Sequence, residues 1–191
     1  MKKFTRAVAI ATLAAVPVIG FSSAPAGAKT VPAKQWSTKF CTALSDWLDS
    51  IQGSTADLQA AIADTTDLAG SKQTIVDYLN TAIDATDTAI ADLKAAGTPK
   101  TTNGAKISAA FVSAMGEAKS IFEKAEADAE DLPTDDVTTF SAETSAIGAQ
   151  ISASASKVDA GFSKVSGLDK NNELNDVVAK TRACKFLNSS S

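Results

Sequence analysis

The sequence predicts an all-α protein, an antiparallel up-down bundle of long helices with a short C-terminal helix, closed by one disulfide. Apolar residues recur at alternating steps of three and four along most of the chain, which is the spacing of one helix face. No segment alternates apolar and polar residues with a period of two over a useful length. The two cysteines, Cys41 and Cys184, lie near opposite ends of the expected bundle. A disulfide between them would join the first and last helices.

The first 28 residues are predicted to be a secretory signal peptide. Three basic residues stand among the first six, residues 7–21 are apolar, and a segment of mostly small residues ends in Ala-Gly-Ala at 26–28. We expect cleavage after Ala28. Cleavage after Ala24 is the alternative, and it would place Pro25 directly after the scissile bond.

A transmembrane anchor is the competing interpretation of this leader. The apolar run contains Pro17 and Gly20 and is shorter than the roughly 20 residues that a spanning helix needs. No cysteine follows the cleavage site to carry a lipid anchor, and no later segment is apolar enough to span a membrane. We therefore favour a cleaved signal.

Removal of 28 residues from the 191-residue chain leaves 163, enough for one domain with a real core. The loss of three positive charges changes the net charge from −4 to −7. This acidic balance argues against nucleic acid or an anionic membrane surface as a partner, because both would repel it.

The first helix is expected to begin near Ala33 or Lys34. Its apolar positions are spaced by four, four, three and four residues, which places them on one helix face. These positions are Trp36, Phe40, Leu44, Trp47 and Ile51. Cys41 lies beside this stripe, where it can reach a neighbouring helix.

Gly53 interrupts the first helical pattern. The next residues have the pattern of a new helix start, with Ser54 as N-cap and Asp57 in the first turn. Helical spacing continues to Ala69, so this part is either one helix kinked at Gly53 or two helices in tandem. Gly70 is expected to end it, because glycine commonly follows a helix C-terminus.

Two longer helices are expected at about 71–96 and 105–131. The loop between them, 97–104, contains two Gly, one Pro and one Asn. The seam of the first consists of Val76, Leu79, Ile83, Thr86, Ile90 and Leu93. The seam of the second consists of Ile107, Phe111, Ala114, Ala118, Ile121 and Ala125.

The fourth helix is expected at about 135–166. Pro133 should end the preceding helix and Thr134 should cap the new one, with two aspartates in its first turn where the helix dipole favours them. Its long seam includes three small or polar residues, Thr144, Ser154 and Gly161. Such a seam permits close approach of another helix but buries modest apolar area.

A break bracketed by Gly167 and Asn171 separates the fourth helix from a final one at about 172–187. Connections of about three to eight residues imply antiparallel neighbours. The resulting layout is a signal peptide at 1–28, an extended and mobile leader at 29–33, a single bundle domain at 34–187 and a polar tail at 188–191.

The absence of histidine limits the chemistry available to the chain. It excludes Ser-His-Asp and Cys-His catalysis, and zinc or haem held by histidine. The sequence also lacks a P-loop, a dinucleotide fingerprint, a G-x-S-x-G motif and an EF-hand loop. We therefore expect no enzyme activity, no catalytic or metal-binding residues and no cofactor.

The densest charge lies between Glu123 and Asp136, where seven acidic side chains precede and follow the turn at Pro133. Hard cations take several carboxylates, so a divalent-cation site is one interpretation. A solvated helix face followed by acidic residues at the next N-terminus is the simpler one, and we favour it.

Trp36, Phe40 and Trp47 could line a pocket for an apolar ligand, and they could equally be core anchors near the disulfide. We favour core anchors. For Cys41 and Cys184 the alternatives to an intramolecular disulfide are a free reactive thiol and a bridge between two chains.

The layout resembles that of uncharacterised small secreted α-helical proteins of actinobacteria. The resemblance lies in the leader MKKFTRAVAIATLAAVPVIGFSSAPAGA, the early segment FCTALSDWLDSIQ and the late segment TRAC. It concerns general organisation and implies no activity and no site.

From the residues we expect a secreted, non-enzymatic helical protein that acts through an unknown protein or cell-envelope partner, outside the cell or at the cell wall. The alternative is a carrier that binds an apolar small molecule or lipid between its helices. Small seam residues can leave a cavity for such a ligand, and a bundle of this kind can also open to give an apolar face to a partner helix. The simpler alternative is a thin, closely packed bundle without a cavity, and we favour it. The sequence indicates no oligomeric state.

Overall fold

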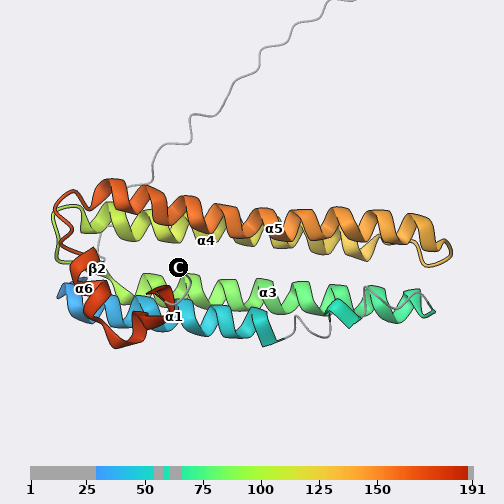
Figure 1. The fold of residues 1–191 in the computed structure, drawn as a ribbon, viewed down its shortest axis with the longest axis horizontal. Coiled ribbons are helices and arrows are strands. Elements are labelled where there is room, and N and C mark those ends of the chain that lie inside the picture. Colours follow the sequence, from blue (N-terminus) through green and yellow to red (C-terminus); the bar gives the residue numbers. More distant parts are fainter. Residues whose placement is uncertain (1–28, 54–57, 61–65, 189–191) are drawn as a thin grey trace, which may run out of the picture.

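The structure is a computed structural model, and it describes residues 29–53, 58–60 and 66–188 (Figure 1). The expected all-α bundle closed by a disulfide is confirmed. The principal helices are α1 (Ala33–Gly53), α3 (Leu68–Ala96), α4 (Gly104–Glu130) and α5 (Val137–Leu168). The short elements are the strands β1 (Thr30–Val31) and β2 (Thr98–Pro99), helix α6 (Asn175–Lys180) and the 3₁₀ helix η1 (Arg182–Asn188).

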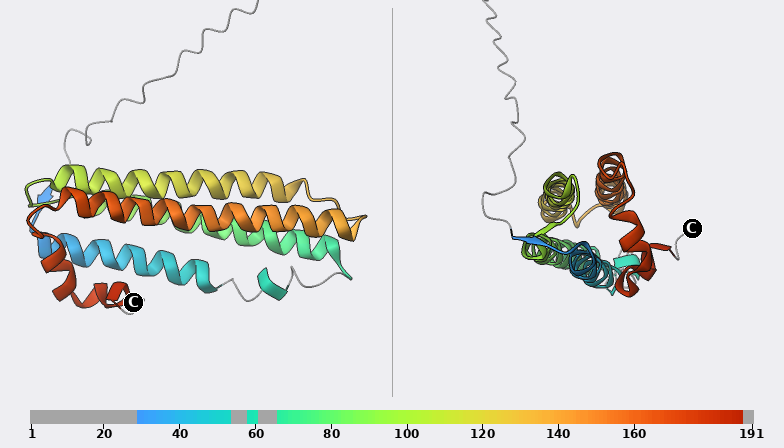
Figure 2. Two further views of the ribbon diagram at one scale, coloured as in Figure 1. Left: turned by 45° about the horizontal axis from the view of Figure 1, so that its top comes forward. Right: turned by 90° about the vertical axis from the view of Figure 1, so that its left-hand side faces the viewer.

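The long helices form two layers, one of α1 with α3 and one of α4 with α5 (Figure 2). Close packing follows the chain order, since α1 packs on α3, α3 on α4 and α4 on α5. The first and last members of this series, α1 and α5, do not pack closely on each other. The C-terminal elements α6 and η1 lie along α1 at one end of the molecule, and this end is called the closed end below.

The core contains the apolar seams expected from the sequence. On α1 the side chains of Trp36, Phe40, Leu44 and Trp47 are buried, and Ile51 is half-buried. Alanines that are fully or nearly fully buried on α3 and α4 let these helices approach closely. These alanines are Ala82, Ala89, Ala118, Ala125 and Ala129.

Two helix starts differ from the sequence prediction. Asp67 caps α3 by accepting a hydrogen bond from the Gly70 amide at 2.9 Å, so Gly70 lies inside the first turn and does not end a helix. Asp136, not Thr134, caps α5, and it accepts from the Thr139 amide at 2.6 Å. In both cases a carboxylate satisfies an amide that has no partner within the helix.

The segment predicted to be a mobile leader is extended, but it is tied to the bundle. β1 pairs in parallel with β2, and the amides of Thr98 and Lys100 donate to the carbonyls of Lys29 and Val31 at 3.0 and 2.8 Å. Gly97 lies beside this pair with a φ of 80°. A side chain at Gly97 would collide with the Lys29 carbonyl, which explains the glycine.

The C-terminal part also differs from the prediction. Gly167 lies within α5, and the expected final helix is divided into α6 and η1. The predicted cap Ser54 and the last three residues of the polar tail lie outside the described residues. Within the described ranges, no helix has the length and apolarity needed to cross a membrane.

Candidate functional site

The Cys41–Cys184 disulfide joins α1 to η1 across a sequence separation of 143 residues. The two Cα atoms are 5.1 Å apart, and both side chains are fully buried. Both cysteines of the chain are therefore used within one molecule, and the alternatives of a free thiol and of a bridge between chains are wrong.

An aromatic cluster fills the closed end and spans three helices. Trp36 stacks on Phe40 with ring centroids 4.6 Å apart, and Phe40 lies 4.4 Å from Phe111 of α4. Phe162 of α5 completes the cluster, 5.0 Å from Phe111 and 6.2 Å from Phe40. This Phe40–Phe162 contact connects α1 with α5 at the closed end.

The three side chains named as ligand-lining candidates are at most 9% exposed. The Trp36 indole donates to the Gly97 carbonyl at 3.1 Å, and the Trp47 indole donates to the Thr86 hydroxyl at 2.9 Å. Both polar atoms of the tryptophans are thus satisfied by the protein. A ligand-lining role for Trp36, Phe40 and Trp47 remains a prediction.

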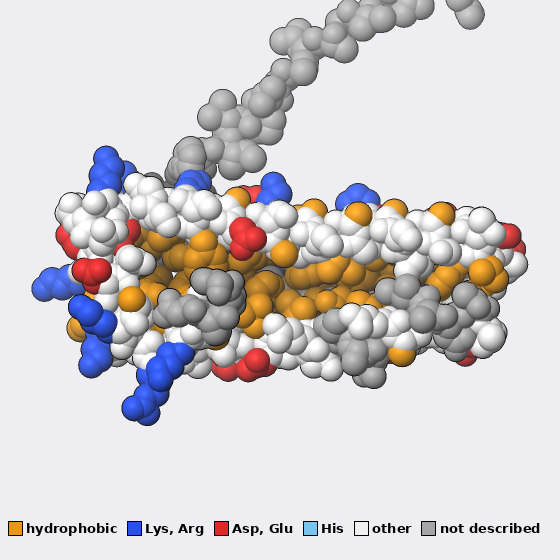
Figure 3. Space-filling view, viewed as in Figure 1, with side chains coloured by type: hydrophobic (Ala, Val, Ile, Leu, Met, Phe, Trp, Pro, Cys, Tyr) orange, Lys and Arg blue, Asp and Glu red, His pale blue; other side chains and the backbone are white. Residues whose placement is uncertain are grey.

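A hollow lined by hydrophobic side chains runs along one face of the molecule. Figure 3 shows it between the layer of α4 and α5 and the layer of α1 and α3. It follows from the packing order of the described helices, because α1 and α5 do not pack closely on each other. We call it the α1–α5 hollow.

The walls of the α1–α5 hollow are assigned by helix geometry. Phe162 marks the face of α5 that points toward α1, and Val158, Ile151 and Thr144 follow on the same face, about one, three and five turns away. Val158 and Ile151 are half-buried hydrophobic residues packed against the core. On α1, Leu48 and Ile51 are half-buried in the same way.

Thr144 adds one polar feature to this face of α5. Its side chain is 5% exposed, and its hydroxyl has no hydrogen-bond partner in the protein. An unpaired buried hydroxyl is costly, and here it lies beneath the surface of the hollow and does not face it.

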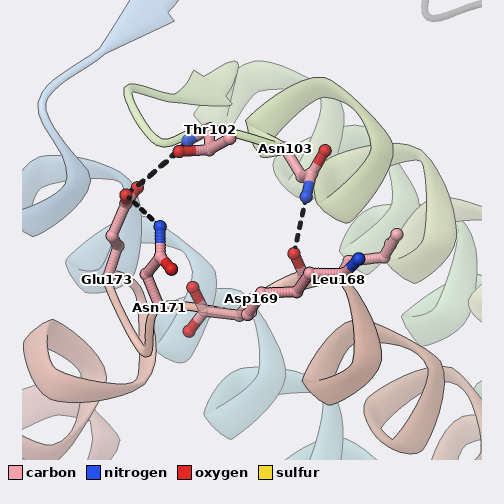
Figure 4. A pocket seen from close by; sticks show the side chains of 7 residues that line it. Thr102, Asn103, Leu168, Asp169, Asn171 and Glu173 are labelled. Atoms are coloured by element: carbon pink, nitrogen blue, oxygen red, sulfur yellow. Dashed lines mark hydrogen bonds between the residues drawn. The ribbon is translucent and has the colours of Figure 1, made fainter.

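A small polar cavity of about 120 Å³ lies at the closed end, between the α3–α4 loop and the α5–α6 loop (Figure 4). Glu173 accepts from both the amide and the hydroxyl of Thr102 at 3.0 Å, and Asn103 donates to the Leu168 carbonyl at 2.7 Å. The Thr102 amide, followed by the side chains of Asn171 and Thr102, lowers the pKa of Glu173. These contacts use the polar groups to hold two loops together.

The acidic turn makes local contacts within the protein. Asp128 accepts from Gln150 at 2.6 Å and pairs with Lys124 at 2.7 Å, and these two partners lower its pKa. Glu123 pairs with Lys119 at 3.4 Å. Across the ranges 29–53, 58–60 and 66–188, no three Asp, Glu or Cys side chains come together in a way that could hold a metal ion.

Comparisons with protein-family models, with curated proteins and with solved structures found no match for this chain. Sequence reasoning placed Ile51 and Thr144 in helix seams but did not indicate that these seams border a hollow. Phe162 was the available signal, since it is the only aromatic residue in α5 after Phe140 and lies in a stretch rich in Ala, Ser and Gly.

Proposed function

We propose that the protein is a secreted, non-enzymatic binding protein that contacts its partner through the α1–α5 hollow. The observation that carries this proposal is the hollow itself, where half-buried hydrophobic side chains gather on one face of the bundle (Figure 3). Large exposed apolar surfaces on folded proteins commonly mark sites of interaction.

Three features support secretion. The leader has the charged, apolar and small-residue regions of a signal peptide. The first hydrogen bond of the bundle to the N-terminal segment uses the Lys29 carbonyl, so cleavage after Ala28 would leave the β1–β2 pair complete. A buried disulfide also suits an oxidising compartment outside the cytosol.

Position-specific photo-crosslinking tests the proposal. A benzophenone amino acid at position 151 lies in the hollow, and the matched control carries it at Ile83, a half-buried residue of α3. Ile83 lies one turn before Asp87, which pairs with Lys119 of α4 at 2.6 Å, so it faces the α3–α4 edge.

Irradiation is done in cells that secrete the protein. We expect one discrete adduct from position 151 and none from position 83. The absence of an adduct at both positions, or the same adducts at both, would contradict a binding role for the hollow.

A carrier for an apolar small molecule or lipid is the second candidate, and the half-buried aliphatic side chains of the hollow favour it. Such a ligand would bury its apolar part in the hollow and keep its polar group in water. Mass spectrometry of organic extracts from the purified secreted protein would detect it as a stoichiometric small molecule. An extract that contains no such molecule would count against the carrier function.

A further inference from the structure

We propose that the occupant of the α1–α5 hollow beyond η1 is an apolar-faced α-helix of a partner protein. This proposal rests on the proposed function, and it names the kind of partner that the hollow fits. The partner helix would carry aliphatic residues at positions i, i+3 or i+4, and i+7.

The first argument is the separation of the hollow's two walls. Packed helices have axes roughly 8–10 Å apart, and α1 and α5 do not reach this packing. At the closed end the rings of Phe40 and Phe162 bridge the gap. Eleven residues further along each antiparallel helix are Ile51 and Ile151, which helix geometry places on nearly the same faces as Phe40 and Phe162. These aliphatic side chains are shorter than the aromatic rings and remain half-buried.

The second argument is continuity with the interface that already exists on α1. At the closed end η1 covers Cys41, which is fully buried and bonded to Cys184. Leu48 lies two turns further on the same face of α1, beyond that bond, and is only half-buried.

The chain itself shows what fits this surface. Segments α6 and η1 are short helical pieces that pack on α1 and contribute half-buried apolar side chains to the core. These side chains are Val178, Ala183, Phe186 and Leu187. A partner helix would continue this cover toward the end of α1.

The third argument is the open form of the hollow, which favours a helix over an acyl chain. Small apolar ligands are usually buried over most of their surface in closed pockets. Cavities of about 120 and 330 Å³ lie at the closed end, away from the hollow, and they are lined by the loops around Thr102 and Lys170 and by β2. An amphipathic helix needs no enclosure, because it buries one face and keeps the other in water.

The rim formed by α5 shows which chemistry the partner needs. From Thr144 to Ser156 this helix has no charged residue. Apolar contacts therefore determine how the partner binds to α5, and the partner helix needs no particular pattern of charges on this side.

The test uses the mature secreted protein and a fluorescein-labelled helical peptide with aliphatic residues at i, i+3, i+4 and i+7. A peptide of identical composition and scrambled order is the control, and neutral phosphatidylcholine vesicles are the lipid probe. Fluorescence anisotropy measures peptide binding, and co-sedimentation measures vesicle binding. We expect binding of the patterned peptide alone.

Variants locate the binding. Ile151→Lys should weaken peptide affinity by about tenfold or more, as expected for a buried anchor position. Ile83→Lys, on the α3–α4 edge, should change affinity less than twofold. Leu48→Lys on the opposite wall provides a second variant if circular dichroism shows that Ile151→Lys is unfolded. Equal binding of the scrambled peptide, unchanged affinity in the hollow variants, or binding of vesicles alone would overturn the helix proposal.

The two proposals fail in different ways. A discrete photo-crosslink at position 151 without binding of the patterned peptide overturns the helical partner and leaves the binding function standing. The absence of that crosslink overturns the proposed function.

Discussion

At the scale of single residues, Gly161 sets how closely α5 approaches α4. A Cβ atom built on Gly161 would lie 2.5 Å from the Ala114 Cβ, which is shorter than a carbon–carbon contact allows. Gly161→Ala should therefore destabilise the protein by about 1–3 kcal/mol through overpacking, despite the better helix propensity of alanine. Urea denaturation measures this free energy of unfolding.

Gly148→Ala is the matched control in the same helix. No atom lies within 4 Å of its added Cβ. Alanine should stabilise the protein there by about 0.4–1 kcal/mol, because glycine loses more backbone entropy on folding. If both variants change the free energy of unfolding in the same direction, the short distance between α5 and α4 is not the reason for glycine at position 161.

The buried Trp47–Thr86 hydrogen bond gives a second prediction. Thr86→Val keeps the shape of the side chain but leaves the Trp47 indole N–H without its acceptor. The expected cost is about 1–3 kcal/mol. Thr88→Val removes an equivalent threonine hydroxyl that bonds to the backbone four residues earlier, but at an exposed position. Thr88→Val should hardly change the free energy of unfolding. A similar loss of stability in both variants would show that the unpaired Trp47 indole is not the cause.

At the scale of helices and strands, the start of α5 depends on Asp136. The Thr139 amide, as the main cause, lowers the pKa of this carboxyl below its ordinary value. The bond therefore stabilises the fold above the unfolded pKa of about 3.9, and this contribution is lost as the pH falls through the lower folded pKa.

Asp136→Ala should accordingly lower the melting temperature at pH 7. Its difference from the wild type should shrink as the pH falls below about 4. Thermal melts between neutral and strongly acidic pH measure this. Asp135→Ala removes the neighbouring exposed carboxylate but keeps the cap, and it should lower the melting temperature at pH 7 less than Asp136→Ala does. A difference that stays constant down to the acid limit would argue against the cap.

The disulfide fixes the C-terminal elements α6 and η1 on α1. None of the side chains of α6 is buried, so this part has few other apolar anchors. We expect the double variant Cys41→Ser, Cys184→Ser to exchange amide hydrogens faster in α6 and η1 while α3 and α4 stay unchanged. The melting temperature should also fall, with a loss below the roughly 5 kcal/mol that chain entropy assigns to so long a loop.

Reduction supplies the control for this prediction. A reducing agent should lower the melting temperature of the wild type and leave that of the double variant unchanged. The native wild type should contain no thiol that reacts before unfolding, because both sulfurs are buried in the bond. Two reactive thiols in the native secreted protein would refute the disulfide.

The sequence predicts helices well where an apolar pattern repeats over many residues. It does not predict elements whose structure depends on contacts between distant segments. The seam of α5 and the stripe of α1 follow from spacing alone. The pairing of β1 with β2 does not follow from spacing, because strands of two residues have no periodic pattern. This pairing also needs a glycine at position 97, where a side chain would collide with the Lys29 carbonyl. Gly70 was misjudged because Asp67, three residues earlier, supplies a better helix start.

At the scale of the whole molecule, the sequence does not predict the α1–α5 hollow. Periodicity shows which face of a helix is buried, but not which helix covers it. The prediction of an up-down bundle is compatible with a closed ring of helices and with the open series that the structure shows. The aromatic anchors Trp36, Phe40 and Trp47 were identified from composition, whereas the aliphatic walls at Ile51 and Ile151 became visible only from the arrangement of the helices.

The open series predicts an order of stability that hydrogen exchange can measure. Helices α3 and α4 each pack between two others, whereas α1 and α5 each have one close partner among the long helices. Amides around Leu79 and Met115 should therefore exchange most slowly, and those around Ile151 faster, because local opening is easier where fewer apolar contacts are lost. Equal protection of α4 and α5 would indicate that the side facing the hollow is not open in solution.

Occupation of the hollow should remove this difference. A helix bound there gives α1 and α5 the second neighbour that each lacks, and binding stabilises only the states that retain its contacts. Addition of the patterned peptide should slow exchange near Leu48, Ile51, Ile151 and Val158 and leave the already protected centre of α3 unchanged. The scrambled peptide should have no effect. A uniform rise in protection across all helices would instead indicate global stabilisation without local coverage of the hollow.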